Sequence, residues 1–167
     1  MILQWVQHEK KEFLDHHRST MNILLHLVCG ILYMSGLILL ISRLCCSLCK
    51  QSKQSYSIWV LWWIVFYGAV CIMMFPESWF LMMVMILALQ YTTSFHFLLS
   101  MSSFKLFLFS SVFYMLPDTG HFISKESTVL SIHNVTIPKI ISNIFLLLPF
   151  SLQCLAIQWS ANEQTTN

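Results

Sequence analysis

Residues 22–42, NILLHLVCGILYMSGLILLIS, decide the fold. This stretch contains no Asp, Glu, Lys or Arg, and a helix needs about 20 mainly apolar residues to cross the hydrocarbon core of a bilayer. Of the 167 residues, 57% are hydrophobic and 10% are charged, whereas soluble domains have about 25% charged residues. The sequence therefore predicts an integral membrane protein. The formal net charge of +2 is too small to indicate a nucleic-acid partner.

Four further apolar runs follow the first one, separated by polar connectors such as Pro76-Glu77-Ser78. The fourth run is short, because its residues would cover only about 20 Å as a helix, less than the core of about 30 Å. We expect an all-α polytopic transmembrane bundle with four to five membrane segments. It would form a single integral membrane domain over residues 1–160, followed by a disordered tail, and Pro149 would kink the last segment. The predicted segments are 22–42, 57–75, 79–99, 104–116 and 138–159, and the tail is 161–167.

Three of the six cysteines form the motif Cys45-Cys46-x-x-Cys49, just past the first apolar run. A zinc site would need a second pair of cysteines or histidines nearby, and none is close in sequence. Cysteines beside a membrane helix suit reversible acylation. Unmodified cysteines at the membrane interface are the alternative.

The number of membrane crossings decides which polar side chains can meet. If all four runs before residue 117 cross, the chain returns at Gly120-His121 to the side on which it began. His96 then lies near the other face. If residues 104–116 do not cross, His121 lies on the wrong side and no cluster forms. The residues expected to gather near one face are His16, His17, His26, His121, Glu126 and His133.

Local geometry adds a condition on the first two of these positions. Asn22 and His26 are four residues apart and share a helix face. His17 lies nine residues before His26, on the opposite side of a continuous helix. For both imidazoles to bind one ion, His17 must precede the helix proper, and Ser19 or Thr20 can cap the helix there. Imidazole nitrogens at such a place suit iron or zinc, and solvated histidines at the membrane interface are the alternative.

The spacing His17-x4-Asn22-x3-His26, with Gly30 four residues on, resembles the opening motif of the 2-hydroxy fatty acid dioxygenases of the endoplasmic-reticulum membrane. Gly120-His121 is similar to the second motif of that family.

The resemblance covers about residues 13–157, and the element LLLPF at 146–150 stands where the family has a Pro-Phe element in its last span. The family's glutamate follows the second motif's histidine by four residues. Here Lys125 stands at that place and Glu126 comes one residue later.

The resemblance implies an Fe(II)-dependent dioxygenase that shortens long-chain 2-hydroxy fatty acids by one carbon, with dioxygen as co-substrate. It implies that His17, His26 and His121 are iron ligands. Asn22 would orient a ligand or hold a substrate oxygen, and Glu126 would be a further ligand or a partner of one. A long acyl chain gains about 0.8 kcal/mol per buried CH₂ in the bilayer, so catalytic groups at headgroup level fit such a substrate.

The rival prediction is a non-enzymatic membrane scaffold, or a degenerate relative without metal, which would tolerate His26→Leu. A transporter is less favoured because four glycines in the whole chain leave few places for broken helices. A hydroxylase or desaturase of the eight-histidine type is disfavoured because the chain has only seven histidines and contains no cluster of the form H-x(2–4)-H-H.

Overall fold

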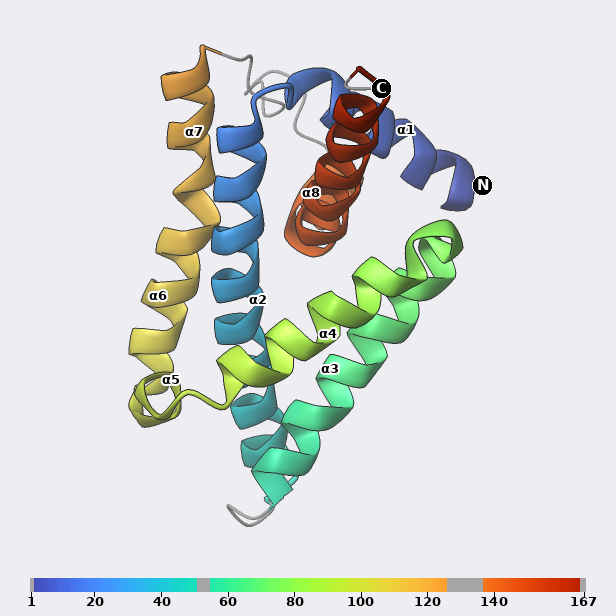
Figure 1. The fold of residues 1–167 in the computed structure, drawn as a ribbon. Coiled ribbons are helices and arrows are strands. Elements are labelled where there is room, and N and C mark those ends of the chain that lie inside the picture. The colour runs from blue at the N-terminus through green and yellow to red at the C-terminus, as the bar shows by residue number, and fades with distance from the viewer. Residues whose placement is uncertain (1, 51–54, 126–136, 166–167) are drawn as a thin grey trace. The chain divides into compact units, whose positions relative to one another are not determined.

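The computed structural model describes residues 2–50, 55–125 and 137–165, and within these ranges the chain is helical without any strand (Figure 1). The all-α fold class is therefore confirmed for the described part of the chain. It divides into two compact units, residues 1–30 with 115–167 and residues 31–114, which are described one at a time. The single membrane domain expected over residues 1–160 stays a prediction.

Two helices of the described chain are long and apolar enough to cross a membrane, by length and composition alone. They are α2 (Thr20–Leu48), which contains the run 22–42, and the part Tyr56–Met74 of α3 (Ser55–Met74). This finding is compatible with membrane association. The expectation of four to five segments goes beyond it and stays a prediction.

The first unit contains α1 (Ile2–His16), the beginning of α2, α7 (Pro117–Ser124) and α8 (Ile137–Thr165). Helix α1 packs on α8, where the rings of Phe13 and Phe150 lie 5.6 Å apart. Helix α8 also approaches α2 closely, because a Cβ atom at Gly30 would lie 3.3 Å from Cδ1 of Leu148. The core of this unit is thus built from residues at both ends of the sequence.

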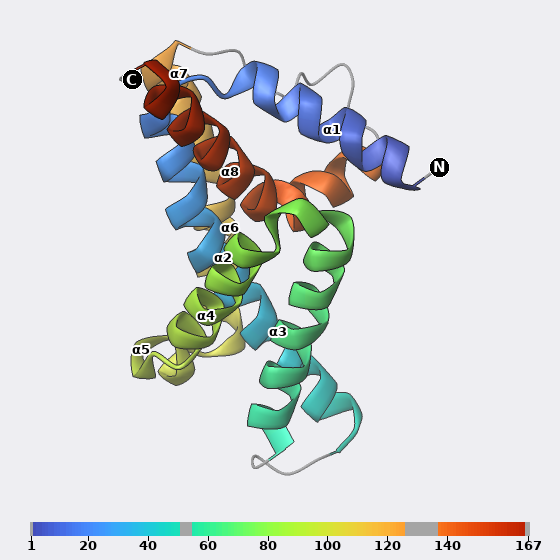
Figure 2. The same ribbon diagram turned by 45° about the vertical axis from the view of Figure 1, so that its right-hand side comes forward.

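Helix α8 carries Pro149 in its interior, where proline removes a backbone hydrogen bond and crowds the preceding turn. Figure 2 shows that α8 changes direction along its length, as the sequence predicts. The predicted disordered tail is wrong over residues 161–165, because α8 continues to Thr165. Ala161, Glu163 and Gln164 favour helix and extend it. Residues 166–167 lie outside the described part.

The second unit contains the rest of α2, then α3, a short 3₁₀ helix (Pro76–Ser78), α4 (Trp79–Thr93), α5 (His96–Ser100) and α6 (Ser103–Met115). Helices α3 and α4 pack as a hairpin, and a Cβ atom at Gly68 would collide with the Ile86 side chain of α4. The turn expected at 76–78 is confirmed as the 3₁₀ helix.

The run 79–99 is not one helix, which corrects the sequence prediction. Helix α4 ends at Thr93, and Phe95 has an extended backbone before α5 begins. The hydroxyls of Thr92, Thr93 and Ser94 donate hydrogen bonds to carbonyls three or four residues earlier. Consecutive side chains of this kind compete with the helical backbone and favour a break. Arg43 of α2 then donates hydrogen bonds to the carbonyls of Leu99 and Met101 at the end of α5.

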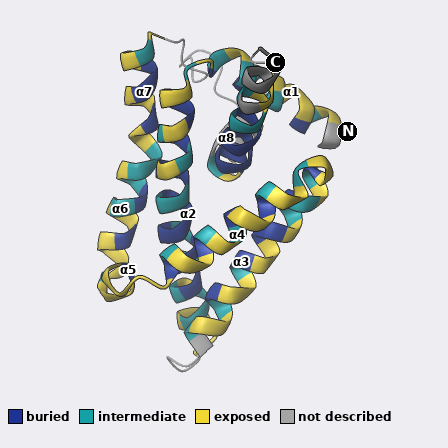
Figure 3. Ribbon diagram, in the orientation of Figure 1, coloured by how far each residue is buried: buried dark blue, intermediate teal, exposed yellow. Residues whose placement is uncertain are grey.

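Exposed residues recur along the helices of the second unit (Figure 3), and they include large apolar ones. Trp62 of α3 is 49% exposed, Phe80 of α4 is 64% exposed and Phe107 of α6 is 54% exposed. Water-soluble proteins rarely expose apolar surface this extensive, whereas lipid or partner helices cover such surfaces. The exposure pattern is therefore compatible with membrane association.

Candidate metal centre

Three segments of the first unit bring one histidine each to a common point. His17 lies in the short link between α1 and α2, His26 lies on α2, and His121 lies on α7. The link places His17 before the helix proper, as the nine-residue spacing requires. All three side chains are buried, with exposed fractions of 3%, 4% and 3%. The expectation that these three residues meet is confirmed.

The ring nitrogens of this histidine cluster are close enough to share one ion. Nε2 of His26 lies 3.0 Å from Nε2 of His17 and 3.2 Å from Nε2 of His121. Imidazole nitrogens bound at about 2.0–2.1 Å lie about 2.9 Å apart at right angles and about 3.4 Å apart in a tetrahedron. The observed separations therefore fit either coordination geometry. The ligand atoms of the cluster all lie within 4.8 Å of one another.

The His17 ring is oriented by its surroundings. Its Nδ1 lies 2.7 Å from the backbone carbonyl oxygen of Phe13, which can only accept, so Nδ1–H donates. The ring also stacks on the Phe13 ring, with centroids 3.7 Å apart and planes 12° apart. Neutral His17 therefore carries its lone pair on Nε2, directed toward the other two histidines, as in metal sites where a carbonyl fixes the tautomer.

The His121 ring is held by Asn22. The Asn22 amide nitrogen lies 3.3 Å from Nδ1 of His121, and Asn22 is 1% exposed. In this arrangement the amide donates to Nδ1, which leaves the proton of neutral His121 on Nε2. Turning the amide by 180° makes its oxygen the acceptor, moves the proton to Nδ1 and frees Nε2 for a metal. Asn22 can thus serve both states of His121.

His26 has one ring nitrogen to which no described residue is hydrogen-bonded. Its Nδ1 is buried and has no hydrogen-bond partner in the described part of the chain. A buried polar atom in this state costs free energy unless water or a ligand contacts it. The cluster therefore contains a ring nitrogen without a described partner in addition to its three adjacent Nε2 atoms. This is what a site that binds a ligand such as a metal ion would show.

A side-chain clamp fixes the backbone next to His17. Gln158 of α8 donates from Nε2 to the carbonyl of Arg18 at 2.7 Å and accepts from the Thr20 hydroxyl at 2.9 Å. Sequence analysis missed this residue. Its only signal is a polar side chain near the end of an apolar run.

Other predicted members of the cluster do not join it in the described structure. His16 ends α1 and is not part of the group of three. His96 begins α5 in the second unit and is exposed, in agreement with its exclusion from the predicted cluster. Glu126 and His133 lie outside the described residues, so the proposed carboxylate is not placed.

Asp118 precedes His121 by one helical turn on α7. Partial desolvation raises the pKa of the Asp118 carboxyl, and the nearby His121 opposes this change. Asp118 does not contribute to the group of metal-ligating side chains found in the described residues.

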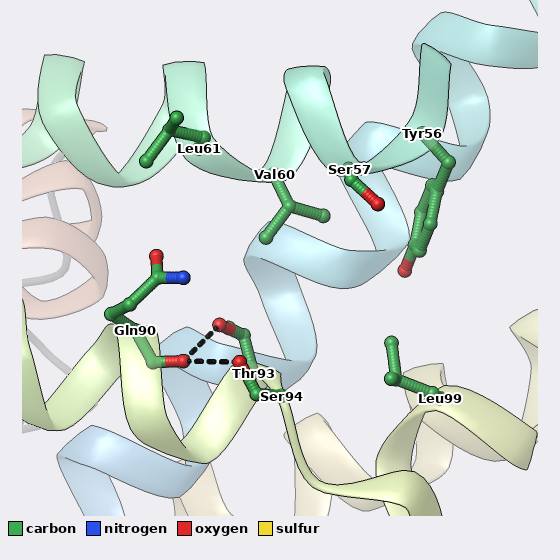
Figure 4. A pocket seen from close by; sticks show the side chains of 8 residues that line it. All are labelled: Tyr56, Ser57, Val60, Leu61, Gln90, Thr93, Ser94 and Leu99. Atoms are coloured by element: carbon green, nitrogen blue, oxygen red, sulfur yellow. Dashed lines mark hydrogen bonds between the residues drawn. The ribbon is translucent and has the colours of Figure 1, made fainter. Parts of the chain in front are cut away.

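The second unit has a cavity of its own, of about 440 Å³ (Figure 4). No lining side chain is charged. The hydroxyls of Thr93 and Ser94 are occupied by backbone carbonyls of α4, as the dashed lines in Figure 4 show for Gln90. The cavity therefore lacks the acid, base or metal ligands that the histidine cluster supplies. Its lining residues are Tyr56, Ser57, Val60, Leu61, Gln90, Thr93, Ser94 and Leu99.

Comparison with family models, curated proteins and solved structures gives no match to this chain.

Proposed function

We propose that this chain is a membrane-bound Fe(II)-dependent dioxygenase that shortens long-chain 2-hydroxy fatty acids by one carbon. The observation that carries the proposal is the buried cluster of His17, His26 and His121, whose ligand atoms lie within 4.8 Å of one another. These residues are separated by up to 104 positions and come from three segments. Their convergence supports a metal site, and the identity of the metal comes from the sequence resemblance.

The donor set fits Fe(II). Three neutral imidazoles suit iron, zinc or copper, and a site with three protein ligands leaves positions open for further ligands. When bound, iron supplies the activation of dioxygen that organic side chains cannot provide. Glu126 is proposed as a fourth ligand or as the partner of a ligand.

Neighbouring residues of the protein hold and orient the rings of the cluster histidines. The Phe13 carbonyl keeps the Nε2 lone pair of His17 directed into the cluster. The Asn22 amide beside Nδ1 of His121, once turned so that its oxygen accepts from Nδ1–H, leaves Nε2 of His121 free for the metal. When Nε2 of His26 holds the metal, the proton of that ring lies on Nδ1, which is buried and has no hydrogen-bond partner among the described residues.

The proposed reaction is balanced without a reductant. A 2-hydroxy acid R–CH(OH)–COOH and O₂ give R–COOH, CO₂ and H₂O: the C1–C2 bond breaks, and the four electrons lost by the substrate reduce dioxygen. No cofactor besides the metal is therefore required. The acyl chain of the substrate would remain in the endoplasmic-reticulum membrane. Four to five membrane segments of the protein would surround it.

Iron content tests the site first. We expect near-stoichiometric iron in detergent-purified wild type after anaerobic reconstitution with Fe(II), and its loss in His26→Ala and in His121→Ala. His96→Ala, at an exposed histidine outside the cluster, is the matched control and should keep its iron.

Activity is then assayed with a 2-hydroxy fatty acid under air, with the acid one carbon shorter as the expected product. A folded protein that binds no iron, together with a His26→Leu variant of unchanged stability, would favour the metal-free scaffold instead.

A further inference from the structure

The end of α2 carries three thiols that the proposed oxidation does not use. Cys45 and Cys46 are half-buried, and Cys49, just past the helix, is exposed. All three are free, and none belongs to the group of metal-ligating side chains found in the described residues. Neither a disulfide nor a metal site therefore accounts for the motif Cys45-Cys46-x-x-Cys49.

The same helix end exposes apolar side chains, which is unfavourable in water. Leu44 is 58% exposed and Leu48 is 74% exposed, one turn apart on one side of α2. Cys45 and Cys49 have the same spacing, one position further along the chain, so a row of thiols runs beside a row of exposed leucines. A side chain attached to this row would therefore extend over the apolar surface of the helix.

The length of α2 places these thiols near a membrane surface. Its 29 residues would extend about 43 Å at 1.5 Å per residue, longer than a hydrocarbon core of about 30 Å. The excess leaves more than one turn at headgroup level when the apolar middle of α2 spans the core. Arg43 and Lys50 flank the motif, as basic residues commonly do at membrane ends.

We propose that the end of α2 is an S-acylation site, at which Cys45, Cys46 or Cys49 receives a long-chain acyl group. The acyl donor is a fatty acyl-coenzyme A thioester, used by a membrane acyltransferase. The cysteine sulfur loses its proton and attacks the acyl carbonyl carbon, the new S–C bond forms, and coenzyme A leaves as a thiol with the proton. One thioester replaces another, so no oxidant or reductant is needed. The attached chain covers Leu44 and Leu48 and enters the bilayer beside them.

The sequence offers a direct measurement on the unaltered protein. Trypsin cleaves after Arg43 and after Lys50, so one peptide, residues 44–50, contains all three thiols and none of the buried cysteines. The full chain is produced in eukaryotic cells and purified from membranes, and this peptide is examined by mass spectrometry. We expect it to carry at least one acyl group that neutral hydroxylamine removes. Recovery of the peptide in unmodified form only would overturn the proposal.

Metabolic labelling with an alkyne-tagged palmitate localises the modification. The triple variant Cys45→Ser/Cys46→Ser/Cys49→Ser should lose the label, whereas Cys71→Ala, at a fully buried cysteine of the same unit, should keep it. A label that persists in the triple variant would place the acyl group elsewhere and contradict the proposal. The peptide measurement on wild type does not depend on the folding of either variant.

Discussion

At the scale of single residues, Gly120 leaves room for the Asn22 amide, which lies beside Nδ1 of His121. A Cβ atom at position 120 would collide with Oδ1 of Asn22 and would lie 3.0 Å from Cδ2 of Leu25. Gly120→Ala should therefore displace the Asn22 amide from His121. Loss of such a partner of a metal ligand typically costs 10- to 100-fold in metal affinity. We expect a loss of about 10-fold or more, measured by titration with Co(II) as a spectroscopic probe of the histidine cluster.

Gly68→Ala is the matched control for this prediction. It also introduces a methyl group at a close helix contact, against Ile86 in the second unit, away from the cluster histidines along the chain. It should change stability but leave Co(II) affinity within about twofold of wild type. Equal affinities for Gly120→Ala and wild type would show that the Asn22 contact does not govern His121.

The group of Phe13 that accepts the hydrogen bond from His17 is its backbone carbonyl, so a substitution of the side chain leaves that acceptor in place. The Phe13 side chain therefore contributes packing. It is 4% exposed and contacts His17 and Phe150. Phe13→Ala should lower the stability of the first unit by about 3–5 kcal/mol, whereas Phe13→Leu, which keeps most of the volume, should cost less than about 1.5 kcal/mol. Thermal unfolding in detergent measures both. A similar loss in the two variants would mean that stacking on His17, rather than volume, determines the effect.

At the scale of elements, α8 positions the link that carries His17. Gln158 bonds both the Arg18 carbonyl and the Thr20 hydroxyl, on either side of the start of α2. Gln158→Leu keeps an uncharged side chain of comparable size but removes both hydrogen bonds, so the link should loosen and Co(II) affinity should fall about 5- to 10-fold. Ser160→Ala, which removes a bond within α8 only, should leave that affinity unchanged. A Gln158→Leu variant with wild-type affinity would show that packing alone holds His17.

Sequence reasoning succeeded where local geometry or counting was sufficient. His17 lies nine positions before His26, on the opposite side of a continuous helix, so His17 must precede the helix for both to bind one ion. The structure places His17 in the link before α2. The break after Thr93 and the clamp by Gln158 could not be predicted in the same way. The first depends on hydroxyls competing with the backbone, and the second joins residues 138 and 140 positions apart. The role of Glu126 stays a prediction because it lies outside the described residues.

At the scale of the whole molecule, the number of membrane crossings before His121 can be measured with native lysines. Four crossings would put Lys11 and Lys125 on one side of the membrane and Lys50 and Lys105 on the other, and all four side chains are exposed in the structure. A membrane-impermeant amine reagent applied to sealed vesicles of one orientation should therefore label one pair and spare the other. Mass spectrometry of the labelled peptides identifies the pair.

Opened vesicles provide the control, because all four lysines should then react and any lysine that stays unlabelled is shielded by the protein.

The comparison that decides whether the short run 104–116 crosses the membrane is between Lys105, near its start, and Lys125, beyond its end. Labelling of both from the same side would mean that this run does not cross. His121 would then have to reach His17 and His26 from the opposite face, which the buried contact of 3.2 Å between His26 and His121 does not allow across a core of about 30 Å. Labelling from opposite sides would instead make the crossing of this run the step that brings the third histidine to the cluster.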